Sequence, residues 1–339
     1  MIDPPRIRDA QSLLARHFGP TRIARAASLS PPGRDVFLKI ETDLPTGSFK
    51  IRGALYSLSV KRAKGAMAEV VCASTGNHGA AVAYAAQLLG VRATIFLPAD
   101  PNPVKAARIR ALGARLVESG VDLSAAIDAA HDYAEQARAF FLHDASDPDV
   151  PVGTATIGIE IVDQVPDVEI IYVPMGDTAL IRGIACAAKQ RRPSIRIVGV
   201  VAKQAPAYLL SWEKSRRSKG SEGWAEGSGR GATGLEPGAD VVETTTCDTI
   251  ADGLAIRRPL APNVAAIREL VDDVVAVSEQ EMIAAIDWLY AREQVIAEPA
   301  GAAATAALLK RATTARTSVV LVTGSNIAPG LEAGLHPLT

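Results

Sequence analysis

The chain contains few cysteines, few aromatic residues and no excess of charge of either sign. Only Cys72, Cys186 and Cys247 occur in 339 residues, and their odd number and wide spacing indicate neither a disulfide framework nor a zinc cluster. The formal net charge is -1, from 36 basic and 37 acidic residues, so nothing indicates binding to nucleic acid or to a membrane surface. We expect a protein of a reducing, cytoplasmic compartment.

Long hydrophobic runs are also missing, although 48% of the residues are hydrophobic. No apolar run approaches the roughly 18 residues that a transmembrane helix needs. The beginning of the chain, MIDPPRIRDAQ, is polar and rich in proline, unlike a signal peptide. The length suits about two domains with a large core, and we expect no membrane span.

Strand-like and helix-like apolar segments alternate along most of the chain. Between residues 69 and 146, short apolar strands alternate with helical segments such as AAVAYAAQLLG. A second series starts near residue 154, and we expect the early strand DVFLKIE to join it. Short connections in such a series are typical of parallel sheets covered by helices. The sequence therefore predicts an α/β fold of two open domains with mainly parallel sheets.

The second series is interrupted by a polar, glycine-rich stretch at 215–240. Gly229, Gly231 and Gly234 have the GxGxxG spacing of dinucleotide-binding loops. That fingerprint has to follow a strand and open a helix, whereas here charged sequence precedes it and Leu-Glu-Pro follows. We interpret the stretch as a surface loop.

One lysine lies in a segment that otherwise suits burial. In TGSFKIRGA, Lys50 is flanked by Phe49 and Ile51, and apolar residues then recur at helical spacing, which places Lys50 in the first turn of a helix that begins near Ser48. Burial and the positive end of the helix dipole both disfavour an ammonium there. A neutral amine can form a Schiff base with an aldehyde. On this segment alone, a lysine that extends into solvent is the alternative.

Two junctions between a strand and a helix suit the binding of anions. The first, ASTGNHG at 73–79, offers backbone N–H groups to a carboxylate, and Asn77 adds a side-chain amide; an ordinary turn is the alternative. The second, VPMGDTAL, suits a phosphate at Gly176 to Leu180. A Schiff-base lysine, a carboxylate cradle and a phosphate cradle together suit pyridoxal phosphate holding an amino acid.

Several segments, in order, resemble the fold-type II pyridoxal-phosphate family in its branch of threonine dehydratases and serine racemases. They are FLKIETDLPTGSFKIRGAL, STGNHG, GTATIGIEI, IADGLA, AEPAGAAA and LVTGSNI. The resemblance covers nearly the whole chain and implies a tryptophan-synthase-β-like fold. It implies a large cofactor-binding domain, 1–68 with 147–339, and a small mobile domain, 69–146, that carries the asparagine loop.

The resemblance also implies the site. Lys50 would carry the cofactor, Asn77 would bond its 3′-hydroxyl group and Thr323 would face its pyridine nitrogen. The expected catalytic residues are Lys50 and Thr75. The expected cofactor contacts are Phe49, Lys50, Asn77, Gly176, Asp177, Thr178, Ala179, Leu180, Gly253, Glu298 and Thr323, and the expected substrate contacts are Ser74, Thr75, Gly76, Asn77 and His78.

The chain departs from this family in its phosphate loop and in one acid/base position. The family usually has a run of glycines where this chain has Gly176, Asp177, Thr178 and Ala179. We expect the Thr178 hydroxyl to bond the phosphate and Asp177 to point outward, capping the helix that begins near Thr178. Thr75 stands where serine racemases carry a serine that donates a proton.

Two further departures concern metal and regulation. Val201, Ala205 and Ala207 lie in the stretch that matches the family's frequent divalent-cation site, and they offer no side-chain oxygen for a hard cation. We therefore expect no metal. The chain ends soon after the Thr323 segment, so we do not expect the feedback control of isoleucine-inhibited threonine dehydratases.

The resemblance implies α,β-elimination of water from an L-3-hydroxy amino acid to give a 2-oxo acid and ammonia. Lys50 would remove the α-proton, and the cofactor phosphate would protonate the leaving hydroxyl group. Serine or threonine is the expected substrate, with a bulkier one such as 3-phenylserine as an alternative and 3-hydroxyaspartate ranked lower. The competing hypotheses are β-replacement, a threonine-synthase-like reaction, racemisation and non-catalytic cofactor binding. The branch is commonly dimeric, so we expect a homodimer.

Overall fold

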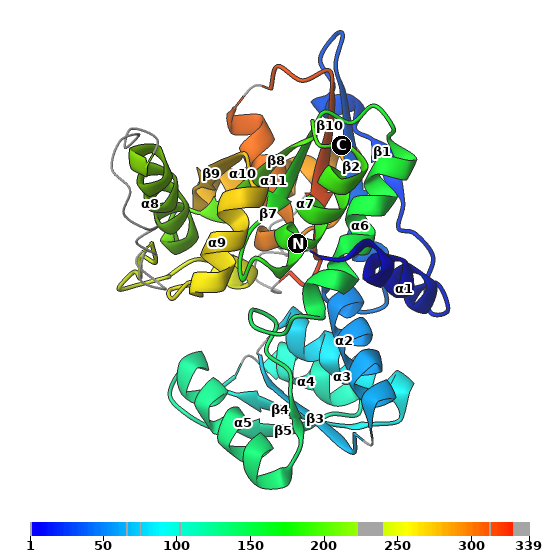
Figure 1. The fold of residues 1–339 in the computed structure, drawn as a ribbon, viewed down its shortest axis with the longest axis vertical. Helices are drawn as coiled ribbons and strands as arrows, with labels where there is room; N and C mark the ends of the chain where they lie inside the picture. The colour runs from blue at the N-terminus through cyan, green and yellow to red at the C-terminus, as the bar shows by residue number, and fades with distance from the viewer. Residues whose placement is uncertain are drawn as a thin grey trace, which may run out of the picture.

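The computed structural model describes residues 2–65, 67–74, 76–101, 103–222, 240–311 and 313–327. Its strands are β1 (Ile23–Arg25), β2 (Asp35–Ile40), β3 (Glu69–Ala73), β4 (Arg92–Leu97), β5 (Arg115–Glu118), β6 (Phe140–Phe141), β7 (Ile170–Pro174), β8 (Arg196–Ala202), β9 (Asp273–Val277) and β10 (Thr317–Val322). They form two separate sheets, a larger one and a smaller one (Figure 1).

The helices fall between these strands. They are α1 (Pro4–Leu14), α2 (Lys50–Lys64), α3 (Asn77–Leu89), α4 (Pro103–Ala111), α5 (Leu123–Ala137), α6 (Val150–Gln164), α7 (Ala179–Arg191), α8 (Ala207–Glu222), α9 (Ala261–Leu270), α10 (Glu279–Glu293) and α11 (Pro299–Lys310). Short 3-10 turns cover Ala27–Leu29, Glu41–Asp43 and Asp252–Leu254. No helix of the described residues is long and apolar enough to cross a membrane.

The larger sheet has the strand order β1-β2-β10-β7-β8-β9. Only the β1–β2 pair is antiparallel, and the other pairs are parallel. Because β2 pairs with β10 from Asp35 opposite Thr317 onward, the early strand does join the later series. The smaller sheet, β5-β4-β3-β6, is parallel throughout. The predicted fold class is therefore confirmed.

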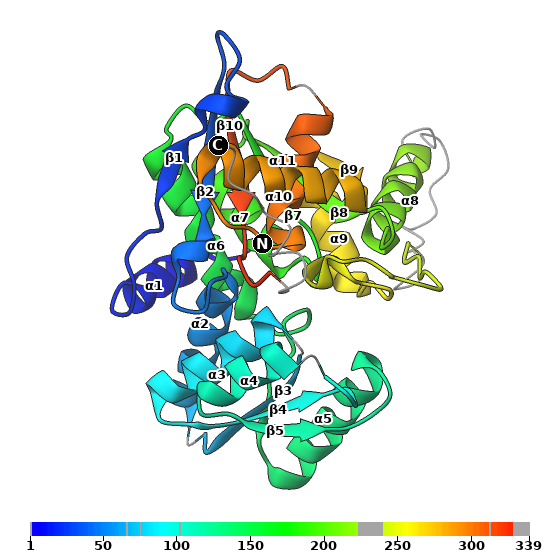
Figure 2. The same cartoon turned by 180° about the vertical axis from the view of Figure 1, so that it is seen from behind.

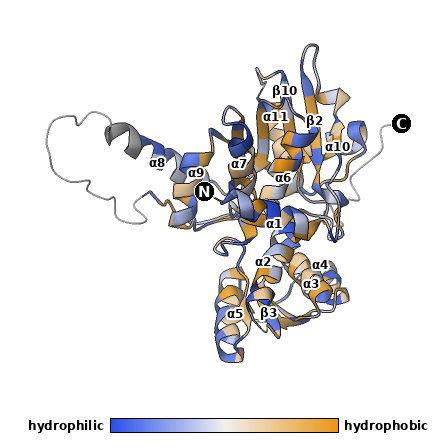
Figure 3. Ribbon diagram, turned by 45° about the vertical axis from the view of Figure 1, so that its right-hand side comes forward, coloured by the Kyte–Doolittle hydropathy of each residue, from blue (hydrophilic) through white to orange (hydrophobic). Residues whose placement is uncertain are grey.

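Both sheets are covered by helices on both faces, because successive side chains of a strand point to opposite sides. In β7, Tyr172 packs with α10 and α11, whereas its neighbours Ile171 and Val173 pack with α6 and α7. In β3, Cys72 packs with α2 and α3, and Val71 packs with α5. Figure 2 shows α10 and α11 on the rear of the larger sheet, and Figure 3 shows hydrophilic residues on α8 and hydrophobic residues on the central strands.

Helix boundaries follow the local signals in part. Gly90 ends α3 in the left-handed region with φ 64°, as a terminal glycine should. α8 extends to Glu222, so the first residues of the expected loop at 215–240 are helical. The glycines at 229, 231 and 234 lie outside the described residues. The proposed domain division stays a prediction.

Candidate active site

The candidate site lies where the carboxyl ends of strands from both sheets face each other. Parallel strands present their carboxyl ends at one edge of a sheet, which is where ligands of open α/β folds bind. Segment 74–78 follows β3, segment 176–180 follows β7 and Thr323 follows β10. Lys50 is the first residue of α2, in the chain segment that connects β2 to the smaller sheet (Figure 1).

Lys50 lies in a cluster of titratable side chains. Its Nζ donates to Asp144 Oδ2 at 2.6 Å and to Asp177 Oδ2 at 2.5 Å. His78 Nδ1 lies 3.6 Å from the same Asp144 oxygen, and His78 Nε2 lies 3.2 Å from the carbonyl oxygen of Leu142. All four residues are largely buried. We call Lys50, His78, Asp144 and Asp177 the lysine cluster.

These contacts overturn the expectation that Lys50 is a neutral amine. Burial does favour the neutral form, but the carboxylates of Asp144 and Asp177 outweigh it and raise the pKa of Lys50 above its usual range. Lys50 is thus an ammonium held between two acids. The segment around Lys50 indicates burial and a helix start, but it does not indicate the two acids, because Asp144 is distant in sequence.

The expectation that Asp177 points outward is also wrong. Its Oδ1 does accept the N–H of Ala179 at 2.8 Å, at the start of α7, but its Oδ2 faces inward to Lys50. Burial and the adjacent Asp144 raise the pKa of Asp177. Burial acts the same way on Asp144, but His78 and Lys50 outweigh it and hold the pKa of Asp144 well below its usual value.

The phosphate-loop residues form a compact turn before α7. Thr178 has φ 74°, the left-handed region that glycine normally occupies. A Cβ on Gly176 would overlap the carbonyl oxygen of Gly253, so the predicted cofactor contacts Gly176 and Gly253 touch each other. Ala179 and Leu180 begin α7, whose first N–H groups have no partner within the helix.

This turn fits a phosphate group on one specific observation. Thr178 Oγ1 is buried and has no hydrogen-bond partner among the described residues. A buried hydroxyl group without a partner costs about 1–3 kcal/mol, and a phosphate oxygen would satisfy it. Asp177 does not suit a phosphate site, because its carboxyl group already accepts the Ala179 N–H that a phosphate oxygen would use. The loop therefore suits a phosphate once Asp177 is protonated or turned.

A second polar group surrounds Asn77, the first residue of α3. Asn77 Nδ2 donates to Glu298 Oε1 at 2.5 Å, and Asn326 donates to Asn77 Oδ1. Glu298 precedes α11, and its burial raises the pKa of its carboxyl group to about 7, despite the hydrogen bond from Asn77. A Cβ on Gly324 would overlap the Glu298 carboxyl group. Asn77 and Glu298, both predicted cofactor contacts, are thus direct partners.

The remaining predicted residues line the same region. The Phe49 ring lies 5.4 Å from Lys50 Nζ, and the Phe49 N–H donates to the Thr323 carbonyl oxygen at 3.0 Å. Gly76 donates to Ser74 Oγ at 3.2 Å, and a Cβ on Gly76 would meet no atom within 4 Å. There is therefore open space at the N-terminus of α3. Thr75 lies outside the described residues.

Sequence reasoning missed two residues of the site, Asp144 and Asn326. Asp144 follows β6, which pairs with β3 in parallel, so an acid after that strand had to lie near segment 74–78. Asn326 follows β10 shortly after Thr323. In both cases the usable signal was a polar residue at the carboxyl end of a predicted parallel strand.

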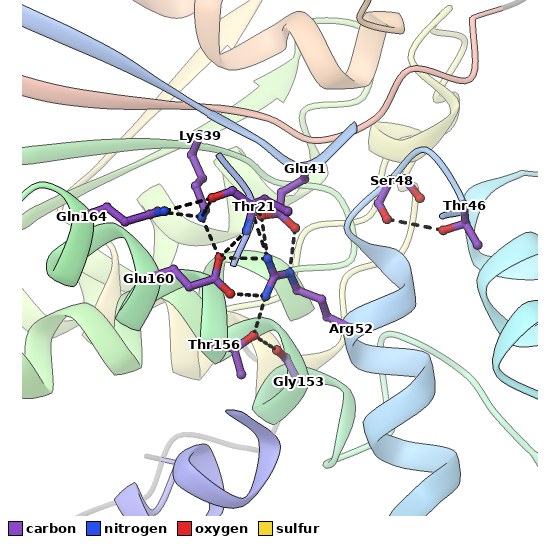
Figure 4. Close-up of polar contacts among 10 residues, drawn as sticks. All are labelled: Thr21, Lys39, Glu41, Thr46, Ser48, Arg52, Gly153, Thr156, Glu160 and Gln164. Carbon is purple, nitrogen blue, oxygen red and sulfur yellow. Dashed lines mark hydrogen bonds and ion pairs between the residues drawn. The ribbon is translucent and has the colours of Figure 1, made fainter. Parts of the chain in front are cut away.

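A second buried ionic cluster lies only two residues from Lys50 along α2 (Figure 4). The Arg52 guanidinium donates to Glu41 through Nε at 2.7 Å and to Glu160 through Nη1 at 2.5 Å. Lys39 Nζ donates to Glu160 at 2.6 Å, to the Thr21 carbonyl oxygen at 2.8 Å and to Gln164 at 2.9 Å. We call this the arginine cluster. It joins β2, α2 and α6.

The stretch that was compared with a cation site lies in the hydrophobic core. Val201, Ala205 and Ala207 are all buried, and Val201 packs with α7 and α8 side chains while Ala205 packs on the opposite face. Among the described residues, one group of three potential metal ligands lies close together, namely the exposed His131, Asp132 and Glu135 on α5.

Comparison with known proteins identifies a family and several proteins to which the chain is similar. Residues 14–324 match the family described as pyridoxal-phosphate dependent enzyme. The chain is 34% identical to L-threonine ammonia-lyase of Thermotoga maritima, over 96% of this chain and 76% of that protein. Maize serine racemase superposes with a TM-score of 0.84 at 28% identity, covering 98% of this chain and 96% of that one. The processed form of threonine deaminase isoform 2 from Solanum lycopersicum superposes with a TM-score of 0.82 at 27% identity, covering 98% and 88%.

Proposed function

The chain belongs to the family of pyridoxal-phosphate dependent enzymes, and on this premise we propose that it eliminates water from an L-3-hydroxy amino acid. The products are a 2-oxo acid and ammonia. Relatives named L-threonine ammonia-lyase and threonine deaminase favour a substrate of the serine and threonine type. The observation that carries the proposal is Lys50, held in the first turn of α2 between the two loops that follow β3 and β7.

The chain's residues divide the work of holding cofactor and substrate. Lys50 would bond the cofactor, and Thr178 and the N-terminus of α7 would hold its phosphate. Asn77, Glu298, Phe49 and Thr323, which contact one another or Lys50 in pairs, would hold its ring. Pyridoxal phosphate, when bound, supplies an electron-withdrawing ring that stabilises negative charge on the substrate Cα.

Substrate binding and proton transfer fall to the loop after β3 and to Lys50. Segment 74–78 presents the N-terminus of α3, which binds the substrate carboxylate. Once the Lys50 amine is free, it removes the Cα proton as a general base. The hydroxyl group on Cβ leaves, and the released enamine hydrolyses in water to the 2-oxo acid and ammonia. We propose that the enzyme works in the cytoplasm as a homodimer, which light scattering of the purified protein tests.

A product assay tests the proposed function. The enzyme is incubated separately with L-threonine, L-serine and 3-phenylserine, and 2-oxo acid, ammonia and D-amino acid are followed together. We expect 2-oxo acid and ammonia in equal amounts, formed much faster than the D-enantiomer. The neutral Thr323 hydroxyl group cannot hold a proton on the pyridine nitrogen by charge, so negative charge on the substrate Cα is less delocalised. Loss of the hydroxyl group on Cβ should then occur before Cα is protonated again. A D-enantiomer formed at a comparable rate makes the enzyme a racemase. Consumption of the substrate that requires an added thiol or amine, and that releases a new amino acid without ammonia, makes it a β-replacement enzyme.

A further inference from the structure

The lysine cluster contains two carboxyl groups that the elimination described above does not use. Lys50 Nζ lies within hydrogen-bonding distance of both, at 2.6 Å from Asp144 and 2.5 Å from Asp177. The two carboxyl groups therefore face the same ammonium, and each affects the pKa of the other. A proton on any of these three groups can therefore move to either of the others without a large side-chain motion.

The charges around the pair indicate that it holds a proton. Two carboxylates in contact away from water cannot both ionise cheaply, so such a pair shares one proton. Among the described residues, Arg182, Tyr208 and His78 are further charged or titratable groups near Asp177, and Cys72 and His78 lie near Asp144. Burial lowers the pKa of His78 and raises that of Cys72, which disfavours the charged form of each. His78 Nε2 donates to the Leu142 carbonyl oxygen, and His78 Nδ1 lies 3.6 Å from Asp144 Oδ2.

The pair also lies beside the place that the substrate must occupy. Lys50 has to reach the substrate Cα, and the start of α3, which carries His78, has to reach the substrate carboxylate. Asp144 lies next to both, at 2.6 Å from Lys50 Nζ and 3.6 Å from His78 Nδ1. A hydroxyl group on Cβ, one bond from Cα, is then close to this acid.

We propose that Asp144 and Asp177 together donate the proton that the leaving hydroxyl group needs, and that Lys50 recharges them. The inference rests on the proposed function and deepens it, because it assigns the acid of the same elimination. In this proposal, side chains of this chain protonate the leaving hydroxyl group, a role that the family resemblance assigns to the cofactor phosphate.

The proposed step balances without a further reagent. The step begins with Lys50 as an uncharged amine and with one proton on the acid pair. Lys50 Nζ takes the Cα proton, and the electron pair of that C–H bond becomes the second bond between Cα and Cβ. The Cβ–O bond breaks, its electron pair stays on oxygen, and the oxygen takes the proton of the acid pair and leaves as water. The acid pair, now without its proton, takes one from the Lys50 ammonium, and the cluster returns to its starting state.

The test compares leaving groups that do and do not need a proton. The holoenzyme and its Asp144→Asn and Asp177→Asn variants are assayed with L-serine and with 3-chloro-L-alanine, whose chloride leaves unprotonated. With L-serine we expect kcat to fall by about 10²–10³-fold in each variant, the usual contribution of a general acid. With 3-chloro-L-alanine we expect a fall below about threefold, because no proton is needed in that step. The exposed Asp128→Asn on α5 is the control and should change neither rate.

The outcomes separate this inference from the proposed function. Equal losses with both substrates would show that the acids only position Lys50, and this overturns the inference. Cofactor loading, measured by visible absorption, and folding, measured by circular dichroism, are recorded for each variant, and if Asp144→Asn does not fold, Asp177→Asn alone decides. A wild-type enzyme that releases no 2-oxo acid from any 3-hydroxy amino acid, but does so from 3-chloro-L-alanine, overturns both.

Discussion

Helix α2 carries two cations that are only two residues apart. Each is buried against its own set of acidic side chains. Lys50 belongs to the lysine cluster, and Arg52 belongs to the arginine cluster, which Figure 4 shows. The two side chains leave the same helix turn in different directions, one toward the loops after β3 and β7 and the other toward β2 and α6. Both side chains are largely buried, with 13% exposure for Lys50 and 1% for Arg52, and they differ most in their partners.

The arginine cluster is balanced in charge. Two cations, Arg52 and Lys39, face two carboxylates, Glu41 and Glu160. A guanidinium group stays protonated in proteins and fixes its partners through a planar fork of donors. Burial raises the pKa of Glu160, but Arg52 and Lys39 outweigh it and lower that pKa, so the carboxylate stays ionised. Such a cluster fixes the positions of β2, α2 and α6 relative to one another.

The lysine cluster has the opposite character. The Lys50 ammonium contacts two carboxyl groups, and burial together with the adjacent Asp144 raises the pKa of Asp177. A histidine whose pKa is lowered by burial, His78, lies beside them. Asp177 is therefore the member of this cluster that can hold an additional proton. The comparison indicates that charge balance, more than burial, separates a structural ionic cluster from a reactive one.

Replacing Lys50 should have the largest effect on activity. Lys50→Ala removes both the cofactor anchor and the base, and we expect turnover to fall by about 10⁴-fold or more, as for nucleophile and base removal elsewhere. The variant should also lose the visible absorption of the bound cofactor, and borohydride should no longer fix the cofactor to the protein. Folding should suffer little, because the remaining acids can take up a proton. Retention of a reducible cofactor bond would identify another lysine as the anchor.

Replacing Arg52 should have the largest effect on stability. Arg52→Met leaves Glu41 and Glu160 buried with too little positive charge, which typically costs about 3–5 kcal/mol. Urea unfolding monitored by circular dichroism measures this loss, with Arg62→Met, near the end of the same helix, as the control for charge and helix propensity. A stability loss below about 1 kcal/mol, the value of an exposed ion pair, would show that the arginine cluster does not hold the fold together.

The two clusters also show what the sequence can and cannot predict. Strand and helix order was predictable because the apolar periodicity is strong, and Lys50 at the start of a helix followed from Ile51, Ala54 and Leu55. The charge state of Lys50 was not, because it depends on Asp144, 94 residues away. Asp177 at a helix start was predictable as a cap, but its inward turn depends on that same long-range contact.

Asp177 should weaken cofactor binding, since its carboxyl group occupies an N–H at the start of α7 that a phosphate group would use. Asp177→Asn removes the negative charge and keeps the size of the side chain. We expect the cofactor to bind about tenfold more tightly to the variant, equivalent to about 1.4 kcal/mol. Fluorescence titration of the cofactor-free protein with pyridoxal phosphate measures this affinity. Weaker binding to the variant would mean that the carboxyl group helps to shape the loop.

Glu298 gives a smaller, pH-dependent effect, because burial raises the pKa of its carboxyl group despite the hydrogen bond from Asn77. Its pKa is raised from 4.5 to about 7 in the fold, so the folded protein binds more protons than the unfolded chain between these values. The stabilising contribution is complete below pH 4.5 and is lost as the pH rises through 7. The free energy of unfolding, measured with urea, should fall between pH 5 and pH 8. This fall should be larger by about 1–3 kcal/mol for the wild type than for Glu298→Gln. Identical pH dependence of the two proteins would show that Glu298 is ionised throughout.

Removal of divalent cations by a chelator should leave the activity of the enzyme unchanged. The side chains of Val201, Ala205 and Ala207 are buried and apolar, and a hard cation needs about six oxygen ligands. The paired carboxyl groups of Asp144 and Asp177 could attract a cation instead, but Lys50 already occupies the position between them. Activity with L-serine after treatment with EDTA should therefore equal that of the untreated enzyme. If EDTA abolished activity and magnesium or calcium restored it, the acid pair would be a candidate cation ligand, and the contrast between a proton-exchanging cluster and a balanced one would fail. Repeating the chelation with Asp144→Asn decides between these cases, because a variant that lost its response to the cation would locate the ion at the pair.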